Sequence, residues 1–160
     1  MARGPVRFQV SLKADELPKW AATFPDAIGH ALYEEALDIF AASQRLVPVD
    51  TGALRNSGSV TKSDLGNGVI EVVIGYGGPA IGYAEKVHDT PPGQAHHAPP
   101  TQWKYLEVPF NNATRGQQNR IIGRAKDLLA GFGINPESAG TATFASDGNA
   151  AIDTTGQYEG

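Results

Sequence analysis

The sequence contains no cysteine and only one methionine, and it has no long apolar run. Without cysteine, disulfide bonds and thiolate metal sites are excluded. A helix that spans a membrane needs about 20 consecutive, mainly apolar residues, and no stretch of this chain approaches that length. Residues 1–7 also lack the apolar segment of a secretory signal peptide. We therefore expect neither a membrane span nor a signal peptide.

Basic residues are absent from the C-terminal stretch, residues 134–160. Four of the 17 acidic residues lie there, whereas all 13 Lys and Arg residues precede it. Residues 1–133 therefore balance 13 acidic residues (17 − 4) against 13 basic ones. A neutral body is poor evidence for a nucleic-acid-binding protein, which is recognised by a basic face.

The same stretch is rich in Gly, Ala, Ser and Thr, and its apolar residues are isolated. Such a segment does not bury enough apolar surface to offset the entropy lost on ordering. We expect one domain over residues 1–133, followed by an extended acidic arm over 134–160 that orders on a partner subunit.

Hydrophobic periodicity predicts an α+β fold. Alternation of apolar and polar residues predicts a strand over 6–13, and a run of β-branched residues predicts a central strand over 69–76. A further strand is expected over 57–61. Apolar spacings of three and four predict a long helix over 23–46 and a C-terminal helix that begins between 111 and 114 and ends near 132. We expect a mixed or antiparallel sheet packed by these two helices.

The long helix shows one apolar stripe, which we expect to be buried. The stripe contains Phe24, Ile28, Leu32, Ile39, Ser43 and Leu46, and it is widened by Tyr33, Leu37 and Phe40. The side that we expect to face water carries Glu34, Glu35, Asp38 and Arg45.

Residues 47–57 read Val-Pro-Val-Asp-Thr-Gly-Ala-Leu-Arg-Asn-Ser and mark the change from a helical to a strand-like pattern. Pro48 has no backbone N–H, so the preceding helix ends near it. Asp50 can accept hydrogen bonds from the amides that follow, and Gly52 permits a backbone conformation that other residues resist. We expect a capped corner and one short helical turn, with Leu54 inside and Arg55 outside.

Asp50-Thr51-Gly52-Ala53 also matches the active-site tetrad of retroviral-type aspartic proteases, and residues 121–124 resemble their second signature. In that chemistry two chains each supply one aspartate, and the pair shares a proton to activate water. Those enzymes are nearly all β, whereas here a helical pattern precedes Asp50 and another contains residues 121–124. Short matches of this kind often arise by chance. We expect no catalytic residues, and the protease stays open as an alternative of another class.

Residues 89–102 contain four prolines and form a long loop, a feature that is usually functional or ordered by a partner. In or next to this loop lie His88, Asp89, His96 and His97, whose side chains suit first-row metals. Their spacing fits no metal motif, and we expect hydrogen-bonding or interface roles instead. We predict no metal and no cofactor; a metal-dependent binding module stays open as an alternative.

One side of the C-terminal helix is basic. We expect it to be a solvated face whose charge is offset by Asp127, and the functional alternative is a surface that faces DNA or an acidic subunit. The basic residues are Arg115, Arg120, Arg124 and Lys126.

Several of these segments, taken in order, resemble one family of tail components of long-tailed bacteriophages. Residues 47–57 are similar to its P-V-D-T-G-x-L-R-x-S signature, and residues 83–88, Tyr-Ala-Glu-Lys-Val-His, are similar to its Y-A-x-x-V-H/E segment. His97, followed by residues 104–110, Lys-Tyr-Leu-Glu-Val-Pro-Phe, resembles its K-F-L-x-x-P return before a C-terminal helix. The resemblance covers roughly residues 20–130.

The family comprises tail-completion, neck and minor-capsid proteins, which are non-enzymatic α+β proteins that join the DNA-filled head to the tail. The resemblance implies a ring, a hexamer or a dodecamer, located in the tail or neck of the virion after assembly in the host cytoplasm. It implies neighbouring neck, tail tube or tail terminator proteins as partners, DNA passing through the ring, and no membrane. A tail terminator that caps the tail tube is the nearest alternative. The residues to which the resemblance gives a structural or subunit-contact role are Pro48, Asp50, Thr51, Gly52, Leu54, Arg55, Tyr83, His88, His97 and Leu106.

Overall fold

The computed structural model describes residues 5–13, 17–66, 69–94, 98–139, 143–144 and 150–151. Most of the expected arm lies outside these residues. Within the arm, two short strands are described, β4 (Thr143–Phe144) and β5 (Ala150–Ala151), which pair antiparallel.

The main sheet has three antiparallel strands in the order β1-β3-β2. They are β1 (Val6–Lys13), β2 (Ser59–Gly66) and β3 (Val69–Tyr76). The predicted α+β class and the central position of β3 are confirmed. The strand expected over 57–61 instead begins at Ser59, because the backbone N–H of Ser57 donates to carbonyls of the preceding helical turn.

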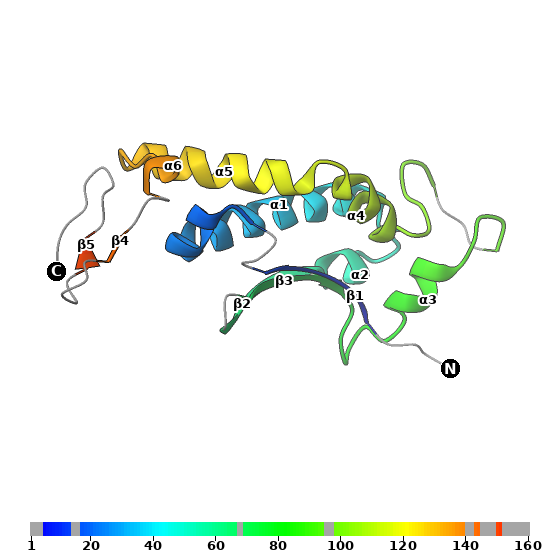
Figure 1. Cartoon of the computed structure of the whole chain (residues 1–160). Helices are drawn as coiled ribbons and strands as arrows, with labels where there is room; N and C mark the ends of the chain where they lie inside the picture. Colours follow the sequence, from blue (N-terminus) through cyan, green and yellow to red (C-terminus); the bar gives the residue numbers. More distant parts are fainter. Residues whose placement is uncertain are drawn as a thin grey trace.

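The helices form two further layers, so that α1 lies between the sheet and α5 (Figure 1). The helical elements are η2 (Lys19–Thr23), a 3-10 helix, followed by α1 (Pro25–Leu46), α2 (Ala53–Asn56), α3 (Ala84–Asp89), α4 (Glu107–Thr114), α5 (Gln117–Gly131) and α6 (Pro136–Ala139). No helix among the described residues has the length and apolar character needed to cross a membrane.

The long helix is confirmed, but the expectation of a single buried stripe is wrong. One side of α1 packs on the sheet, where the rings of Phe40 and Tyr76 lie 5.7 Å apart. The other side packs on α5, whose Ile121 is fully buried. Glu35 lies in this second interface and is only 2% exposed. A second covering layer therefore places a residue expected in water inside the protein.

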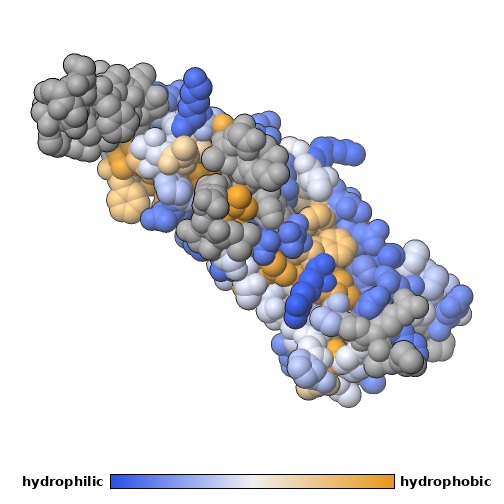
Figure 2. Space-filling view, turned by 60° about the horizontal axis from the view of Figure 1, so that its bottom comes forward, coloured by the Kyte–Doolittle hydropathy of each residue, from blue (hydrophilic) through white to orange (hydrophobic). Residues whose placement is uncertain are grey.

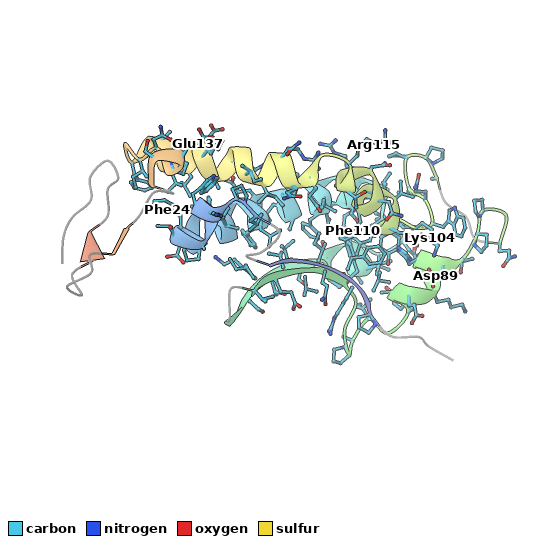
Figure 3. The ribbon with its side chains drawn as sticks, viewed as in Figure 1. Phe24, Asp89, Lys104, Phe110, Arg115 and Glu137 are labelled. Carbon is cyan, nitrogen blue, oxygen red and sulfur yellow. The ribbon has the colours of Figure 1, made fainter. Side chains whose placement is uncertain are left out.

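The single C-terminal helix that we expected is two helices. Arg115 has an extended backbone with ψ 115° and ends α4. Gly116 then adopts φ +70°, a left-handed conformation that glycine takes at little cost, and α5 begins at Gln117. The turn lets α4 pack on the sheet side: the ring of Phe110, labelled in Figure 3, meets that of Phe8 at 5.0 Å.

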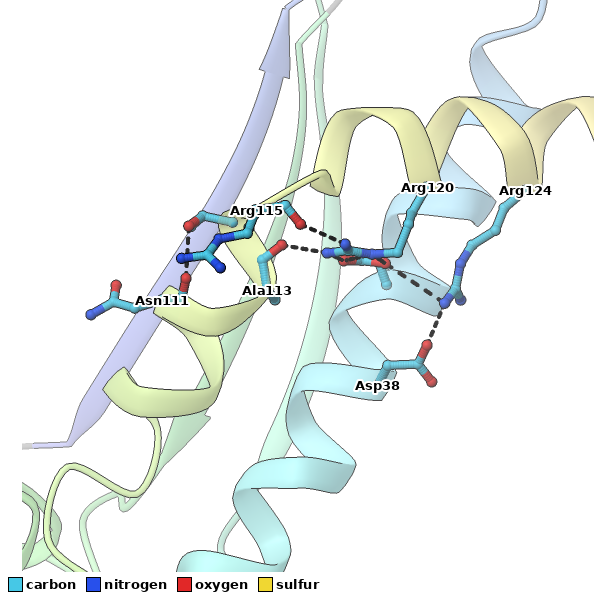
Figure 4. Close-up of polar contacts among 8 residues, drawn as sticks. Asp38, Asn111, Ala113, Arg115, Arg120 and Arg124 are labelled. Carbon is cyan, nitrogen blue, oxygen red and sulfur yellow. Dashed lines mark hydrogen bonds and ion pairs between the residues drawn. The ribbon is translucent and has the colours of Figure 1, made fainter.

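The basic side of α5 binds α1 rather than facing only solvent (Figure 4). Arg120 donates to both carboxylate oxygens of Glu35, with its Nε 2.9 Å from Oε1. Arg120 also donates to the carbonyls of Ala113 and Arg115, which join α4 to α5. Arg124 pairs with Asp38, and its Nη2 lies 3.6 Å from Glu35 Oε2. Lys126 pairs instead with Glu137 of α6, at 2.5 Å. The prediction that Asp127 offsets these charges is therefore wrong: acidic residues of α1 and α6 pair with them.

Gly77 follows β3 at a crowded junction. Its φ is +96°, and a Cβ atom there would lie 2.8 Å from Ala84 Cβ, 3.0 Å from the Ile81 carbonyl and 3.1 Å from Pro5 Cα. Only glycine satisfies both the conformation and the space.

We predict that Glu35→Gln lowers the free energy of unfolding by about 2–3 kcal/mol, because it leaves Arg120 without its anionic partner in a mostly buried interface. Glu34→Gln is the matched control: Glu34 is the preceding residue, and its side chain is 43% exposed. The control should cost less than about 1 kcal/mol, as for surface pairs. If both variants lose the same free energy of unfolding in denaturant titrations, the pair of Glu35 with Arg120 does not stabilise the protein.

We predict opposite effects for two glycine substitutions. Gly77→Ala should destabilise the protein by about 2–4 kcal/mol through backbone strain and overlap. Gly123→Ala should be neutral or stabilise it by up to about 1 kcal/mol, since a Cβ there meets nothing within 4 Å and alanine favours helices. Thermal unfolding of both variants checks the difference in sign.

Candidate functional site

The corner after α1 ends the helix as predicted. The last helical hydrogen bond runs from the Val47 N–H to the Ser43 carbonyl at 3.0 Å, and Val47 is extended with ψ 124°. The free carbonyl of Leu46 accepts from the Gln102 N–H at 2.8 Å. The proline-rich loop therefore caps the C-terminus of α1.

The predicted turn follows, with one difference in its cap. Gly52 adopts φ +86° and precedes α2, and Leu54 is buried, as expected. The expected cap by Asp50 is wrong: the α2 N-cap makes no side-chain hydrogen bond, and the Ala53 N–H donates to Thr51 Oγ1 at 3.3 Å. Asp50 is exposed.

Two polar side chains brace this corner against the sheet. Ser57 donates from Oγ to the Leu54 carbonyl at 2.6 Å and accepts from the Gly77 N–H at 2.9 Å. Gln44 donates from Nε2 to the Arg55 carbonyl and to the Tyr76 hydroxyl, both at 3.1 Å. The corner is thereby joined to α1 and to the end of β3.

A second brace joins α3 to α4. The hydroxyl of Tyr105 donates to the Ala84 carbonyl at 2.9 Å, and burial raises the pKa of Tyr105. The backbone N–H of Lys104 donates to the His88 carbonyl at 2.7 Å. Lys104 Nζ then bridges the carboxylates of Asp89 and Glu107 at 3.0 and 2.9 Å (Figure 3 labels Asp89 and Lys104).

His88 is at the centre of this brace and is 3% exposed. Its Nδ1 lies 2.8 Å from Asp89 Oδ1, and its Nε2 accepts from the Glu107 N–H at 3.2 Å, at the first residue of α4. These bonds fit a neutral ring that donates from Nδ1. Burial lowers the pKa of His88, and the hydrogen bond from His88 lowers the pKa of Asp89.

The surface of the corner forms a groove of about 650 Å³, which we call the corner groove. All the predicted residues from Pro48 to Arg55 line it, together with Tyr83 and the loop residues Ala98, Pro99 and Thr101. Val49 and Tyr83 are large apolar groups that stay exposed there, at 48% and 40%. The structure thus brings together two motifs that are about 30 residues apart.

The remaining predicted site residues have other positions. His88 and Leu106 are buried behind the corner groove, where they hold α3 and α4 to the core. Arg55, expected outside, is half-buried. His97 lies outside the described residues, as does His96.

The described part of the chain shows no group of side chains that could hold a metal ion, and it does not bring the two protease-like motifs together. Among those residues, no three His, Asp or Glu side chains are grouped to hold a metal ion. Residues 121–124 lie inside α5, where Ile121 is buried and Arg124 binds Asp38, and not beside Asp50.

Sequence reasoning missed two features of this region. The roles of Gln44 and Ser57 depend on Tyr76 and Gly77, which are distant in the chain, and no local pattern signals them. Arg45 is exposed, as expected, but the groove that it lines together with Arg55 was not foreseen, because it depends on α2 lying beside the last turns of α1.

Comparisons of the chain with models of known protein families, with curated proteins and with solved structures find no match.

We predict that acidification destabilises the protein through His88. Below the ordinary histidine pKa of 6.5 the unfolded chain takes up a proton that folded His88 resists, so stability is full above this pH and falls as the pH drops. The loss of unfolding free energy from about pH 7.5 to about pH 5.5 should be smaller in His88→Gln than in the wild type. His30→Gln, which changes an exposed histidine of α1, is the control and should leave the loss unchanged.

Proposed function

We propose that this protein is a structural subunit of a long-tailed bacteriophage virion, a neck or tail-completion protein that joins head and tail as part of a ring. One observation carries the proposal. Residues 48–55, 83–88 and 104–106, through which the chain resembles that family, lie together around one end of α1.

The roles of these residues in the structure support a scaffold. Leu54, His88 and Leu106 are buried. The polar groups around them bond mainly to backbone: Thr51 to Ala53, Ser57 to Gly77 and His88 to the start of α4. Such groups fix a surface in place, and the surface they fix is the corner groove.

The shape of the subunit supports a ring. The chain is elongated, with the end of α5 and α6 far from α2 and α3 along its long axis (Figure 1). The view from the sheet side shows a mainly hydrophilic surface with apolar atoms in separate places (Figure 2). Two different ends favour heterologous, head-to-tail contacts, which close into a ring under rotational symmetry.

We predict that the full-length protein forms closed rings of about six or twelve copies at micromolar concentration. Mass photometry gives the copy number, and negative-stain electron microscopy shows whether the particles close. Leu54→Ala should lose rings, because a cavity of this kind costs about 2–4 kcal/mol in the corner.

Asp50→Asn is the matched change in the same corner and should leave rings at least partly assembled, because Asp50 is exposed and its loss opens no cavity. Wild-type chains that stay monomeric or dimeric contradict the proposal. Peptide cleavage that Asp50→Asn abolishes would instead establish the protease.

A further inference from the structure

Two arginines face one groove beside the corner. Arg45, in the last turn of α1, and Arg55, in α2, line a groove of about 670 Å³ together with Phe40, Gln44 and Pro100. We call it the arginine groove.

These arginines differ from those of α5 in their partners. Arg120 and Arg124 bind carboxylates of α1, whereas neither Arg45 nor Arg55 is in an ion pair within the part of the chain that the structure describes. The Nε of Arg55 is buried there and meets no acceptor among these residues. A buried donor without a partner costs stability, and a carboxylate that reaches it removes the cost.

The arginine groove continues on both sides. Arg45 and Pro100 also line a groove of about 660 Å³ between α1 and α4, and Arg55 also lines the corner groove. Val108 and Val49, at the two sides, are large apolar groups exposed at 37% and 48%. The result is one trough with arginines at its middle and mainly apolar surface on either side. Its acidic residues are Glu35 and Asp38 on one side, which pair with Arg120 and Arg124, and Asp50 on the other.

The C-terminal arm of the sequence has complementary chemistry. Beyond Ala139 it contains Asp147, Asp153 and Glu159 and no basic residue. Two of these acids directly follow an apolar residue, in Ile152-Asp153 and Tyr158-Glu159. An apolar side chain beside a carboxylate suits an apolar trough that carries unpaired arginines.

We propose that the arm of one copy, residues 140–160, docks in the arginine groove of the next copy, with its carboxylates on Arg45 and Arg55. This inference rests on the proposed ring. The arm leaves from α6, near the start of α1, whereas the groove lies at the end of α1 (Figure 1). The 22 residues of α1 span about 33 Å, so the arm begins at the opposite end of the helix from the groove. An extended arm of 21 residues is long enough to reach either groove, and the head-to-tail contacts of the proposed ring favour the groove of the next copy.

The test places a photoreactive cross-linker in the arm of the full-length protein. Tyr158 is replaced by p-benzoylphenylalanine, and rings are assembled from an equal mixture of unlabelled and isotopically heavy chains. After irradiation, mass spectrometry identifies the cross-linked residues. We expect residue 158 to join groove residues in the segment 40–55 or near Pro100, with light chains joined to heavy ones at the frequency of random mixing.

Charge variants show whether the arginines hold the arm. Arg45→Glu with Arg55→Glu should lower cross-link yield at least about tenfold. Reversing the charge of the arm in the same protein, by Asp153→Lys and Glu159→Lys, should restore the cross-link yield. Neutralising the arm alone, with Asp147→Asn, Asp153→Asn and Glu159→Gln, should also lower the yield without touching the folded domain. Arg7→Glu, on the outer face of β1, is the matched control and should have no effect.

The outcomes separate this inference from the proposed function. Rings that form without groove cross-links, or that cross-link only within single chains, overturn the docking and leave the ring standing. A cross-link yield that is unchanged by Arg45→Glu with Arg55→Glu also overturns the docking. A wild-type protein that forms no rings overturns the proposed function itself.

Discussion

The burial of α1 on two opposite sides is the constraint on which the rest of this structure depends. Where a helix is covered on two sides, an acidic residue that lies inside the second interface needs a cation from the covering helix. Glu35 meets this need through Arg120, which also bonds the carbonyls of Ala113 and Arg115. The same guanidinium thus holds α5 on α1 and fixes the turn that sends α4 toward the sheet. The position of α4 beside α1 follows from the placement of α5.

Much of the fold was predictable, because strand alternation and helical spacing are local signals. The bounds of α1 and β3, the stop before Pro48 and the left-handed Gly52 all follow from a few neighbouring residues. The errors have a common cause in tertiary contacts. Glu35 was expected in water because its partner lies 85 residues away. The break at Gly116 was missed because Asn111, Asn112 and Thr114, which precede it, are residue types that favour a helix N-cap. In the site, the sequence indicated which residues form the corner, whereas the bonds of Gln44 and Ser57 depended on the sheet.

Two groups of charged residues in the described structure have different consequences. Glu35, Asp38, Arg120 and Arg124 are matched inside the subunit and stabilise its layers. Arg45 and Arg55 border a groove at the surface and are unmatched among the described residues. The neutral overall charge of residues 1–133 conceals this difference, because it sums over both groups. Where the charges lie, and not their total, determines which surface attracts an acidic segment.

The proline-rich loop is attached to the domain through backbone groups at its ends. The Gln102 N–H binds the Leu46 carbonyl, and the Lys104 N–H binds the His88 carbonyl. Neither of these two bonds uses a side chain of the loop, so a side-chain substitution that keeps the backbone path leaves both bonds in place. Ala98 and Pro99, which line the corner groove, can therefore change without removing either bond. A fold built this way can change the partner that it recognises by point substitutions, without acquiring a new scaffold.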